Sequence, residues 1–489
     1  MTSPTRHVAD PGLRPADVAA YARSPRTSGI EVSLDAYGGD ALVGVRRARA
    51  DLDAAQQDGA VYGLTTGVGA LRHVSIEPDG ADNGSHALRL WRSHAGGFGP
   101  ELGDEVARGT MLVRLHQLLR GGSGVEPALV EALASALEAG SVPRLHAYGG
   151  IGTGDLTVLA QLGLTLVGEL PWRSGATAPT PVAEGDALAF ASSNALTATV
   201  GSIAVTGLAA LARTTEQVAA LSHLALRGSL QAYDPRVHAA KDDPYAVGVA
   251  SRLTALLAGP EREAVRLQDP FGLRAVPQVH APWEEALTIA ELALAAEIGA
   301  AGENPLAVDG TALHHGQFLT QRIAATLDAV RATAVPVLSL LTARLGALLD
   351  PRLTGLPAFL AAGPQGSSGL MIVEYVAADL LSQVRSAATP VTGGHTVVSL
   401  GVEEHASHST QAAWDTHQLL DLLPDLLACE LVAAVRALRL DPSRLADCPA
   451  SELFARADAA LPDVRPDHIV GAELEAASSL VRATAGITD

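Results

Sequence analysis

The chain has 489 residues, of which 48% are hydrophobic, 18% charged and 3% aromatic, and its formal net charge is −19. An acidic chain with few aromatic residues offers neither phosphate neutralisation nor base stacking, so we expect no nucleic-acid partner. The two cysteines, Cys429 and Cys448, form neither a disulfide framework nor a metal-ligand pattern. We expect a reducing cytoplasm, no metal, and a homo-oligomer, because so apolar a composition is typical of chains that bury surface between subunits.

The first part of the chain is rich in proline and then in glycine. Residues 1–29 contain four prolines among scattered charges and lack the apolar core of a signal peptide, which predicts a flexible tail. Glycine clusters follow at residues 63–69, 96–99 and 121–124. Because glycine supplies backbone conformations that other residues resist, we interpret residues 30–200 as a loop-rich site domain.

The remainder, residues 201–489, is Ala- and Leu-rich with helical periodicity, which predicts a bundle of long helices. One of these helices is expected over residues 282–298, with Pro282 in the first turn. Residues 187–212 carry no charge and are long enough to raise the question of a membrane span. Seven serine, threonine and asparagine residues interrupt that stretch, so we interpret it as a buried bundle helix and expect no membrane partner.

Several ordered motifs lie between residues 62 and 408. They are Tyr62-Gly63-Leu64-Thr65-Thr66-Gly67-Val68-Gly69, Ser93-His94-Ala95-Gly96, Gly152-Thr153-Gly154-Asp155-Leu156, Gln268-Asp269-Pro270-Phe271-Gly272-Leu273-Arg274, Glu303-Asn304-Pro305-Leu306, Ser368-Gly369-Leu370-Met371 and Glu403-Glu404-His405. In order and approximate spacing this set resembles the aromatic amino acid ammonia-lyases, such as histidine and phenylalanine ammonia-lyases, and their aminomutase relatives. The resemblance implies a mainly α fold, a homotetramer with sites built from several subunits, and a small-molecule substrate.

The resemblance also implies roles for individual residues, each with a simpler alternative. Tyr62 matches the tyrosine base that removes a β-proton, although it is also acceptable as an ordinary loop tyrosine. Arg274 matches an arginine that binds the substrate carboxylate, and its alternative is a structural ion pair. His94 matches a pocket histidine, and its alternative is a hydrogen-bonded polar residue.

The chain departs from the family at the loop that forms the prosthetic group. In the family an Ala-Ser-Gly triplet cyclises and loses two waters to give 4-methylideneimidazol-5-one (MIO), the electrophile that takes up the substrate amine. Here the triplet is Gly152-Thr153-Gly154. Thr153 keeps a β-hydroxyl, but its product would carry an ethylidene that is more hindered and less electrophilic. The simpler alternative is a glycine loop in which Thr153 or Asp155 caps a helix starting near Leu156.

Other matched positions have lost polar groups. Phe271 replaces a tyrosine, Gln383 replaces a glutamate that handles the substrate ammonium, and Val402 replaces a glutamine. Ser192 stands where an asparagine is expected, although Asn194 takes that role if the register slips. Losing a carboxylate and polar donors from one pocket weakens the case for binding an amino acid zwitterion.

Three hypotheses follow. The first is an enzyme that lacks MIO and uses a tyrosine base and an arginine anchor for elimination, conjugate addition, isomerisation or cyclisation of a small or carrier-tethered substrate, plausible in specialised metabolism. The second is an ammonia-lyase or aminomutase with a methyl-substituted MIO, and the third is a non-catalytic scaffold. For the first we expect no cofactor and assign Tyr62, Thr153 and His94 as catalytic. The expected substrate-binding residues are Arg274, Ser192, Asn194, Gln268, Phe271, His314, Gln383 and Glu403.

Overall fold

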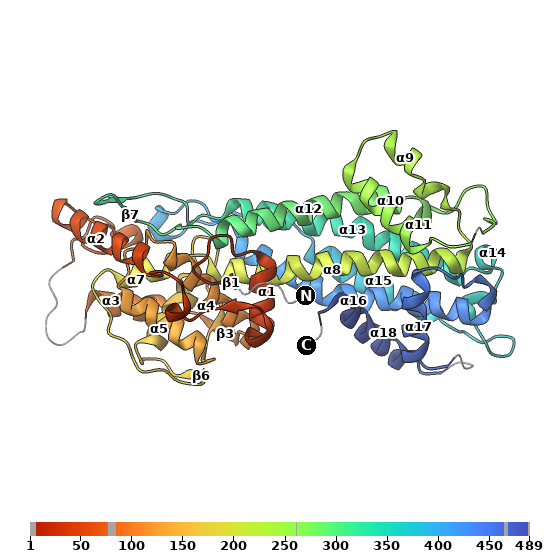
Figure 1. Ribbon diagram of the computed structural model, residues 1–489, viewed down its shortest axis with the longest axis horizontal. Helices are drawn as coiled ribbons and strands as arrows, with labels where there is room; N and C mark the ends of the chain where they lie inside the picture. Colours follow the sequence, from red (N-terminus) through yellow and green to blue (C-terminus); the bar gives the residue numbers. More distant parts are fainter. Residues whose placement is uncertain (1–5, 77–84, 261, 464–467, 488–489) are drawn as a thin grey trace. The chain divides into compact units, whose positions relative to one another are not determined.

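The computed structural model describes residues 6–76, 85–260, 262–463 and 468–487 (Figure 1). It is mainly α-helical with short strands, which confirms the fold class predicted from the sequence. The chain divides into two compact units. Unit 1 comprises Met1–Thr206, Ala290–Leu327 and Pro390–Trp414, and unit 2 comprises Gly207–Ile289, Asp328–Thr389 and Asp415–Asp489.

Unit 1 combines short helices with two-stranded sheets. Its helices are α1 (Pro15–Arg23), α2 (Val43–Asp58), α3 (His86–His94), α4 (Asp104–Leu119), α5 (Pro127–Glu138), α6 (Leu156–Leu166) and α7 (Asp186–Ala191). Its strands are β1 (Arg6–His7), β2 (Ile30–Glu31), β3 (Phe98–Glu101), β4 (Val142–Pro143), β5 (His146–Tyr148), β6 (Trp172–Ser174), β7 (Leu306–Val308) and β8 (Thr311–Leu313). The pair β1–β2 is parallel, whereas β3–β5, β4–β6 and β7–β8 are antiparallel. Helix α4 packs against α1 and α5, and α6 packs against α3 and α7.

The division between the units falls within four long helices. These are α8 (Ala195–Leu226), α12 (Val276–Ile298), α13 (Gln321–Leu349) and α16 (Ser409–Leu440). Helix α8 shows why polar residues are tolerated in an apolar helix: the hydroxyls of Thr199 and Ser202 donate to the carbonyls four residues earlier, at 2.8 and 2.6 Å. Buried hydroxyls are thereby satisfied inside the helix itself.

Unit 2 carries the remaining helices, which are α9 (Pro235–Ala239), α10 (Pro244–Leu256), α11 (Phe271–Arg274), α14 (Pro351–Thr354), α15 (Met371–Ala387), α17 (Ala450–Ala460) and α18 (Val470–Ala485). A fully buried ion pair joins Arg344 and Glu430, with nitrogen–oxygen distances of 2.6 and 2.9 Å. Arg344 also donates to the carbonyl of Gly272 at 3.1 Å, and Tyr233 donates to that of Leu273 at 2.8 Å. These bonds hold the short helix α11 in place.

Two expectations from the sequence need correction. Residues 6–29 do not form the expected flexible tail, because they contain β1 and α1, with Val8, Leu13 and Tyr21 almost fully buried. Helix α12 starts at Val276, so that Pro282 lies inside it rather than in its first turn. In the first segment Pro15 begins α1, a position that suits proline, and buried apolar side chains fix the segment. In α12 the packing of the helix tolerates an internal proline.

By length and composition alone, the helical stretches Asp186–Leu226 and Gln321–Leu349 meet the criterion for a membrane span. In the first, 83% of the apolar window is buried within the fold. The sequence predicted this burial for residues 187–212, but not the break at residues 192–194 that divides the stretch into α7 and α8.

Candidate active site

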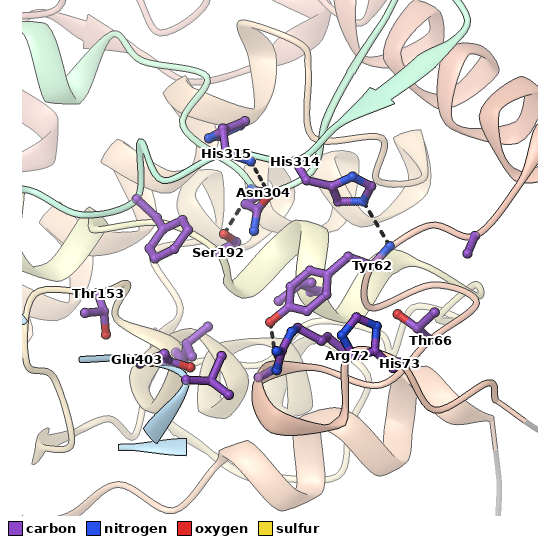
Figure 2. A pocket seen from close by; sticks show the side chains of 16 residues that line it. Tyr62, Thr66, Arg72, His73, Thr153, Ser192, Asn304, His314, His315 and Glu403 are labelled. Atoms are coloured by element: carbon purple, nitrogen blue, oxygen red, sulfur yellow. Dashed lines mark hydrogen bonds between the residues drawn. The ribbon is translucent and has the colours of Figure 1, made fainter. Parts of the chain in front are cut away.

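A cavity of about 630 Å³ lies entirely within unit 1. Its walls come from the loop after α2, the start of α6, the end of α7, the segment around β8 and residues 402–403 (Figure 2). The lining residues are Ala60, Tyr62, Thr66, Gly69, Arg72, His73, Thr153, Leu156, Leu188, Ser192, Asn304, His314, His315, Phe318, Val402 and Glu403.

Tyr62 is held at both ends. Its hydroxyl accepts a hydrogen bond from the backbone N–H of Gly69 at 2.7 Å, and its own N–H donates to His314 Nε2 at 3.2 Å. Figure 2 shows its ring crossing the cavity between His314 and the Arg72–His73 pair. Burial raises the pKa of the Tyr62 phenol, whereas the Gly69 bond opposes this shift because it stabilises the phenolate.

Gly69 is a position where only glycine fits. Its φ is +56°, and a Cβ there would lie 2.4 Å from Ser399 Oγ and 3.5 Å from Glu403 Oε1. Glycine at this position therefore lets the short 3₁₀ helices Gly69–Leu71 and Ser399–Gly401 pack closely. In this conformation the Gly69 N–H donates to the Tyr62 hydroxyl.

The triplet Gly152-Thr153-Gly154 is fixed by two buried hydrogen bonds. Ser407 Oγ donates to the Gly152 carbonyl at 2.7 Å, and the Gly154 N–H donates to Asn194 Oδ1 at 3.2 Å. The middle residue, Thr153, lines the cavity. A Cβ on Gly152, whose φ is +79°, would lie 2.1 Å from Ser407 Oγ and 2.6 Å from Ser409 Oγ.

Asp155 is the N-cap residue of α6, but its carboxylate does not cap that helix. It accepts instead from the N–H and the hydroxyl of Thr197, both at 2.9 Å. Burial raises the pKa of Asp155 to about 6, against these hydrogen bonds. The carboxylate thus ties the loop to α8 rather than satisfying the first turn of α6.

A second buried acid, Glu297, lies next to Asn194. The Asn194 Nδ2 approaches Glu297 Oε1 at 3.4 Å and donates to the Phe318 carbonyl at 2.9 Å. Burial raises the pKa of Glu297 to about 7, with added repulsion from Asp155 and Glu303. A substantial fraction of Glu297 is therefore protonated in the folded protein near neutral pH.

Replacing Glu297 by glutamine should flatten the stability profile in the neutral range. Because the folded pKa of about 7 exceeds the unfolded value, the wild type loses stability as pH rises through it. Glutamine keeps an oxygen that can accept the hydrogen bond from Asn194 Nδ2, and it carries no charge at any pH. Melting temperatures measured from about pH 5 to about pH 8 should fall less for Glu297→Gln than for wild type. Glu291→Gln, exposed on α12, is the control, and parallel profiles for all three proteins would contradict the expectation.

The structure brings five of the residues proposed from the sequence to this cavity, namely Tyr62, Thr153, Ser192, His314 and Glu403. Ser192 Oγ accepts from the Asn304 N–H at 3.2 Å, whereas Asn194 supports the triplet from behind. His94 at the end of α3 does not line the cavity, and its Nδ1 lies 2.9 Å from the Leu90 carbonyl and 3.0 Å from Ser93 Oγ.

The other four proposed residues belong to unit 2, and none of them lines this cavity. The Arg274 guanidinium lies over the Phe271 ring, 4.5 Å from its centroid, and Phe271 is 65% exposed. Arg274 Nε has no hydrogen-bond partner among the described residues. Gln268 is exposed, and exposed Gln383 donates to Asp379 at 3.1 Å.

The sequence did not single out several other lining residues. Arg72 and His73 follow the Gly69 loop directly, and Asn304 lies within a motif already noted. His315 donates its N–H to Asn304 Oδ1 at 3.0 Å. For Arg72, His73 and Asn304, the signal in the sequence was their position in or beside a recognised motif. Ser407 could not be found in this way, because it contacts Gly152, which lies 255 residues earlier in the chain.

A family model described as aromatic amino acid lyase matches residues 13–459. The chain belongs to this family. It is 32% identical to histidine ammonia-lyase of Geobacillus thermodenitrificans, with 94% of each chain covered. It is 33% identical to histidine ammonia-lyase of Streptomyces avermitilis, with 96% of this chain and 95% of the relative covered. The family and these relatives indicate an enzyme of the lyase class.

Solved structures share the fold. Histidine ammonia-lyase from Trypanosoma cruzi is 25% identical with a TM-score of 0.85, over 97% of this chain and 93% of that one. The ergothionase of Treponema denticola, in complex with desmethyl-ergothioneine sulfonic acid, is 22% identical with a TM-score of 0.88, over 98% of both chains.

The surroundings of residues 152–154 fit the triplet present and not the usual Ala-Ser-Gly of the family. An alanine side chain at position 152 would overlap the hydroxyls of Ser407 and Ser409, which are almost fully buried. The residue that would carry the reactive carbon is threonine, so the family's usual MIO does not fit this site unchanged.

Proposed function

We propose that this protein is a lyase-like enzyme that works without MIO and uses Tyr62 as its base. The hydrogen bond from the Gly69 N–H to the Tyr62 hydroxyl is the observation that carries the proposal. It lies in the cavity that also contains Thr153 and Glu403. A backbone donor aimed at the phenol oxygen stabilises the phenolate against the opposing effect of burial, and it holds the oxygen in place for proton transfer.

A linear triplet is supported by the hydrogen bonds around it. Cyclisation would remove the Gly152 carbonyl oxygen as water and the proton of the Gly154 nitrogen. Both groups already have partners, Ser407 and Asn194, in a buried setting where each hydrogen bond contributes about 1 kcal/mol. The linear state would lose these two bonds on closing the ring.

The proposed chemistry needs only groups of this chain. The Tyr62 phenolate removes a proton from an acidic C–H, Arg72 provides positive charge for an anionic end of the substrate, and His73 lies beside it as a hydrogen-bonding group. Without an electrophile that activates an amine, the substrate must already carry an activated carbonyl or alkene. We propose a small or carrier-tethered substrate in specialised metabolism, and a cytoplasmic location.

We further propose a homotetramer in which Arg274 and Phe271 of a second copy complete the site. The support is that Phe271, which is 65% exposed, carries the Arg274 guanidinium over its ring, while neither residue lines the cavity of its own chain. Gln268 and Gln383, both exposed in unit 2, belong to the same proposed contribution, and His94 is proposed to approach the substrate from the end of α3.

A second candidate is an ammonia-lyase or aminomutase with a methyl-substituted MIO. The retained β-hydroxyl of Thr153 and the similarity to histidine ammonia-lyases favour it. In that case Ser407 would polarise the Gly152 carbonyl, and the hydrogen bond to Asn194 would orient the Gly154 nitrogen. The two candidates differ in the covalent state of residues 152–154.

Intact mass spectrometry of the full-length protein should give the mass encoded by the sequence. The reason is that the linear triplet is held by two buried hydrogen bonds and the threonine methyl hinders the closed product. Thr153→Ala, which cannot dehydrate, is the control and should differ from wild type only by the substitution. A wild-type mass lower by two waters, absent from Thr153→Ala, would contradict the proposal and establish the second candidate.

Purified protein should release no ammonia above background from histidine, phenylalanine or tyrosine. The β-proton of these substrates is weakly acidic and the amine leaves poorly, so a phenol base alone does not lower the barrier enough. Absorbance of urocanate, cinnamate and coumarate is the measurement. Formation of any of them by wild type, abolished in Thr153→Ala, would instead support the ammonia-lyase.

A further inference from the structure

A second cavity, of about 190 Å³, lies at the C-terminal end of α8 and belongs entirely to unit 2. It shares no residue with the cavity around Tyr62. The lining residues are His223, Leu224, Arg227, Gly228, Arg262, Glu263, Ser443 and Arg444. Three guanidinium groups and one imidazole thus surround a small space that contains one carboxylate.

His223 is buried in the wall of this cavity. Its side chain is 2% exposed, and neither ring nitrogen has a hydrogen-bond partner among the described residues. Burial lowers the pKa of His223 to about 4. The nearby Asp269 and the Gly228 backbone oppose this shift, whereas Arg262 and Arg266 add to it. The ring is neutral at physiological pH and has one N–H to donate, and a buried donor without an acceptor destabilises the folded protein.

Two of the arginines also have unused donors. Arg262 Nη2 donates to the Leu257 carbonyl at 2.5 Å, but its Nη1 is buried without a partner in the described part of the chain. Arg227, exposed directly after α8, makes no side-chain hydrogen bond or ion pair with another described residue. Glu263, at the same cavity, is exposed and offsets one of these two positive charges.

The carbonyls at the end of α8 would repel an anion, but other arginines cover them. Arg444 donates to the Ala225 carbonyl at 2.7 Å and pairs with Asp441 at 2.8 Å. Arg266 donates to the Leu226 carbonyl at 2.5 Å. The negative end of the helix dipole is thereby neutralised next to the cavity.

We propose that this cavity binds a phosphate group, with Arg227, Arg262 and the ring N–H of His223 as donors. A tetrahedral oxyanion has enough acceptor oxygens for all three, and guanidinium groups bind phosphate through charge-assisted hydrogen bonds. The small volume and the buried imidazole restrict the site to the phosphate group itself, carried either by inorganic phosphate or by a phosphomonoester.

The test is isothermal titration of the full-length protein with inorganic phosphate, beside thermal unfolding at matched ionic strength in sodium chloride. We expect saturable binding and a melting temperature raised by phosphate and not by chloride. Arg227→Gln and Arg262→Gln should each weaken binding about tenfold or more, the effect of losing about 1.4 kcal/mol. Arg236→Gln, which changes an arginine with a 90% exposed side chain on α9, should bind as wild type does.

A parallel titration with phenyl phosphate distinguishes the two sources. Tighter binding than inorganic phosphate assigns a phosphorylated metabolite, and weaker or absent binding assigns the free ion. Because Arg227 is exposed, Arg227→Gln should fold even if Arg262→Gln does not. Absence of saturable phosphate binding, an equal effect of chloride, or unchanged affinity in Arg227→Gln and Arg262→Gln would overturn the proposal.

Discussion

Replacing Tyr62 by phenylalanine should lower kcat by about 10²–10⁴-fold, the usual contribution of a positioned acid–base group. The change deletes one hydroxyl and leaves the packing volume unchanged, so oligomeric state should stay the same. The Gly69 N–H loses its acceptor, which should lower stability by about 1 kcal/mol. Turnover is to be measured on small carboxylates and thioesters that carry an acidic C–H or an activated alkene.

The pH profile separates a base from a structural tyrosine. Because burial raises the pKa of Tyr62, the phenolate forms only as pH rises beyond the ordinary range of a phenol. Wild-type kcat should therefore increase with pH over the whole neutral range, and Tyr62→Phe should lack this limb. Tyr148→Phe, which changes an exposed tyrosine, is the matched control. Full activity of Tyr62→Phe with an unchanged profile would exclude Tyr62 as the base.

The fold could be predicted where many residues share one pattern. Ala- and Leu-rich periodicity indicated the long helices, and the uncharged stretch of α8 proved to be a buried helix with internally bonded hydroxyls. The same pattern could not predict where α12 starts or that residues 6–29 are folded. Both depend on which apolar side chains are buried in the tertiary structure, such as Val8 and Tyr21 in the N-terminal segment and Val276 at the start of α12.

The cavity could be predicted in part because its residues lie within ordered motifs. Tyr62, Thr153 and Glu403 are far apart in the chain, yet the motif order alone associated them before any contact was known. The sequence left open whether Ser192 or Asn194 takes the asparagine position. The structure gives each a separate place, since Ser192 lines the cavity and Asn194 accepts from the Gly154 N–H.

Supporting contacts were beyond sequence reasoning. Ser407 and Ser409 follow the Glu403 motif by only a few residues, but nothing in that spacing indicates that their hydroxyls surround Gly152. Such contacts can be predicted only when the positions of both loops in the folded chain are known. They also give the Gly-Thr-Gly departure a physical reason, because a glycine at position 152 leaves room for two buried hydroxyls.

Gly152→Ala should therefore destabilise the protein by about 2–5 kcal/mol. A residue with a Cβ at a φ of +79° costs about 1–2 kcal/mol. Overlap with the hydroxyls of Ser407 and Ser409 adds about 1–3 kcal/mol of overpacking. The free energy of unfolding from urea titration is the measurement, with Gly393→Ala as the control, because a Cβ at that position meets no atom within 4 Å.

The double variant Gly152→Ala/Ser409→Ala tests the cause of that loss. Removing the Ser409 hydroxyl frees part of the space for the new methyl group, so the double variant should be more stable than the two separate losses together predict. Some cost should remain, because the positive φ and the contact with Ser407 persist. If Gly152→Ala alone is as stable as wild type, the two serines relax freely, and steric fit does not explain why this chain has glycine where its family has alanine.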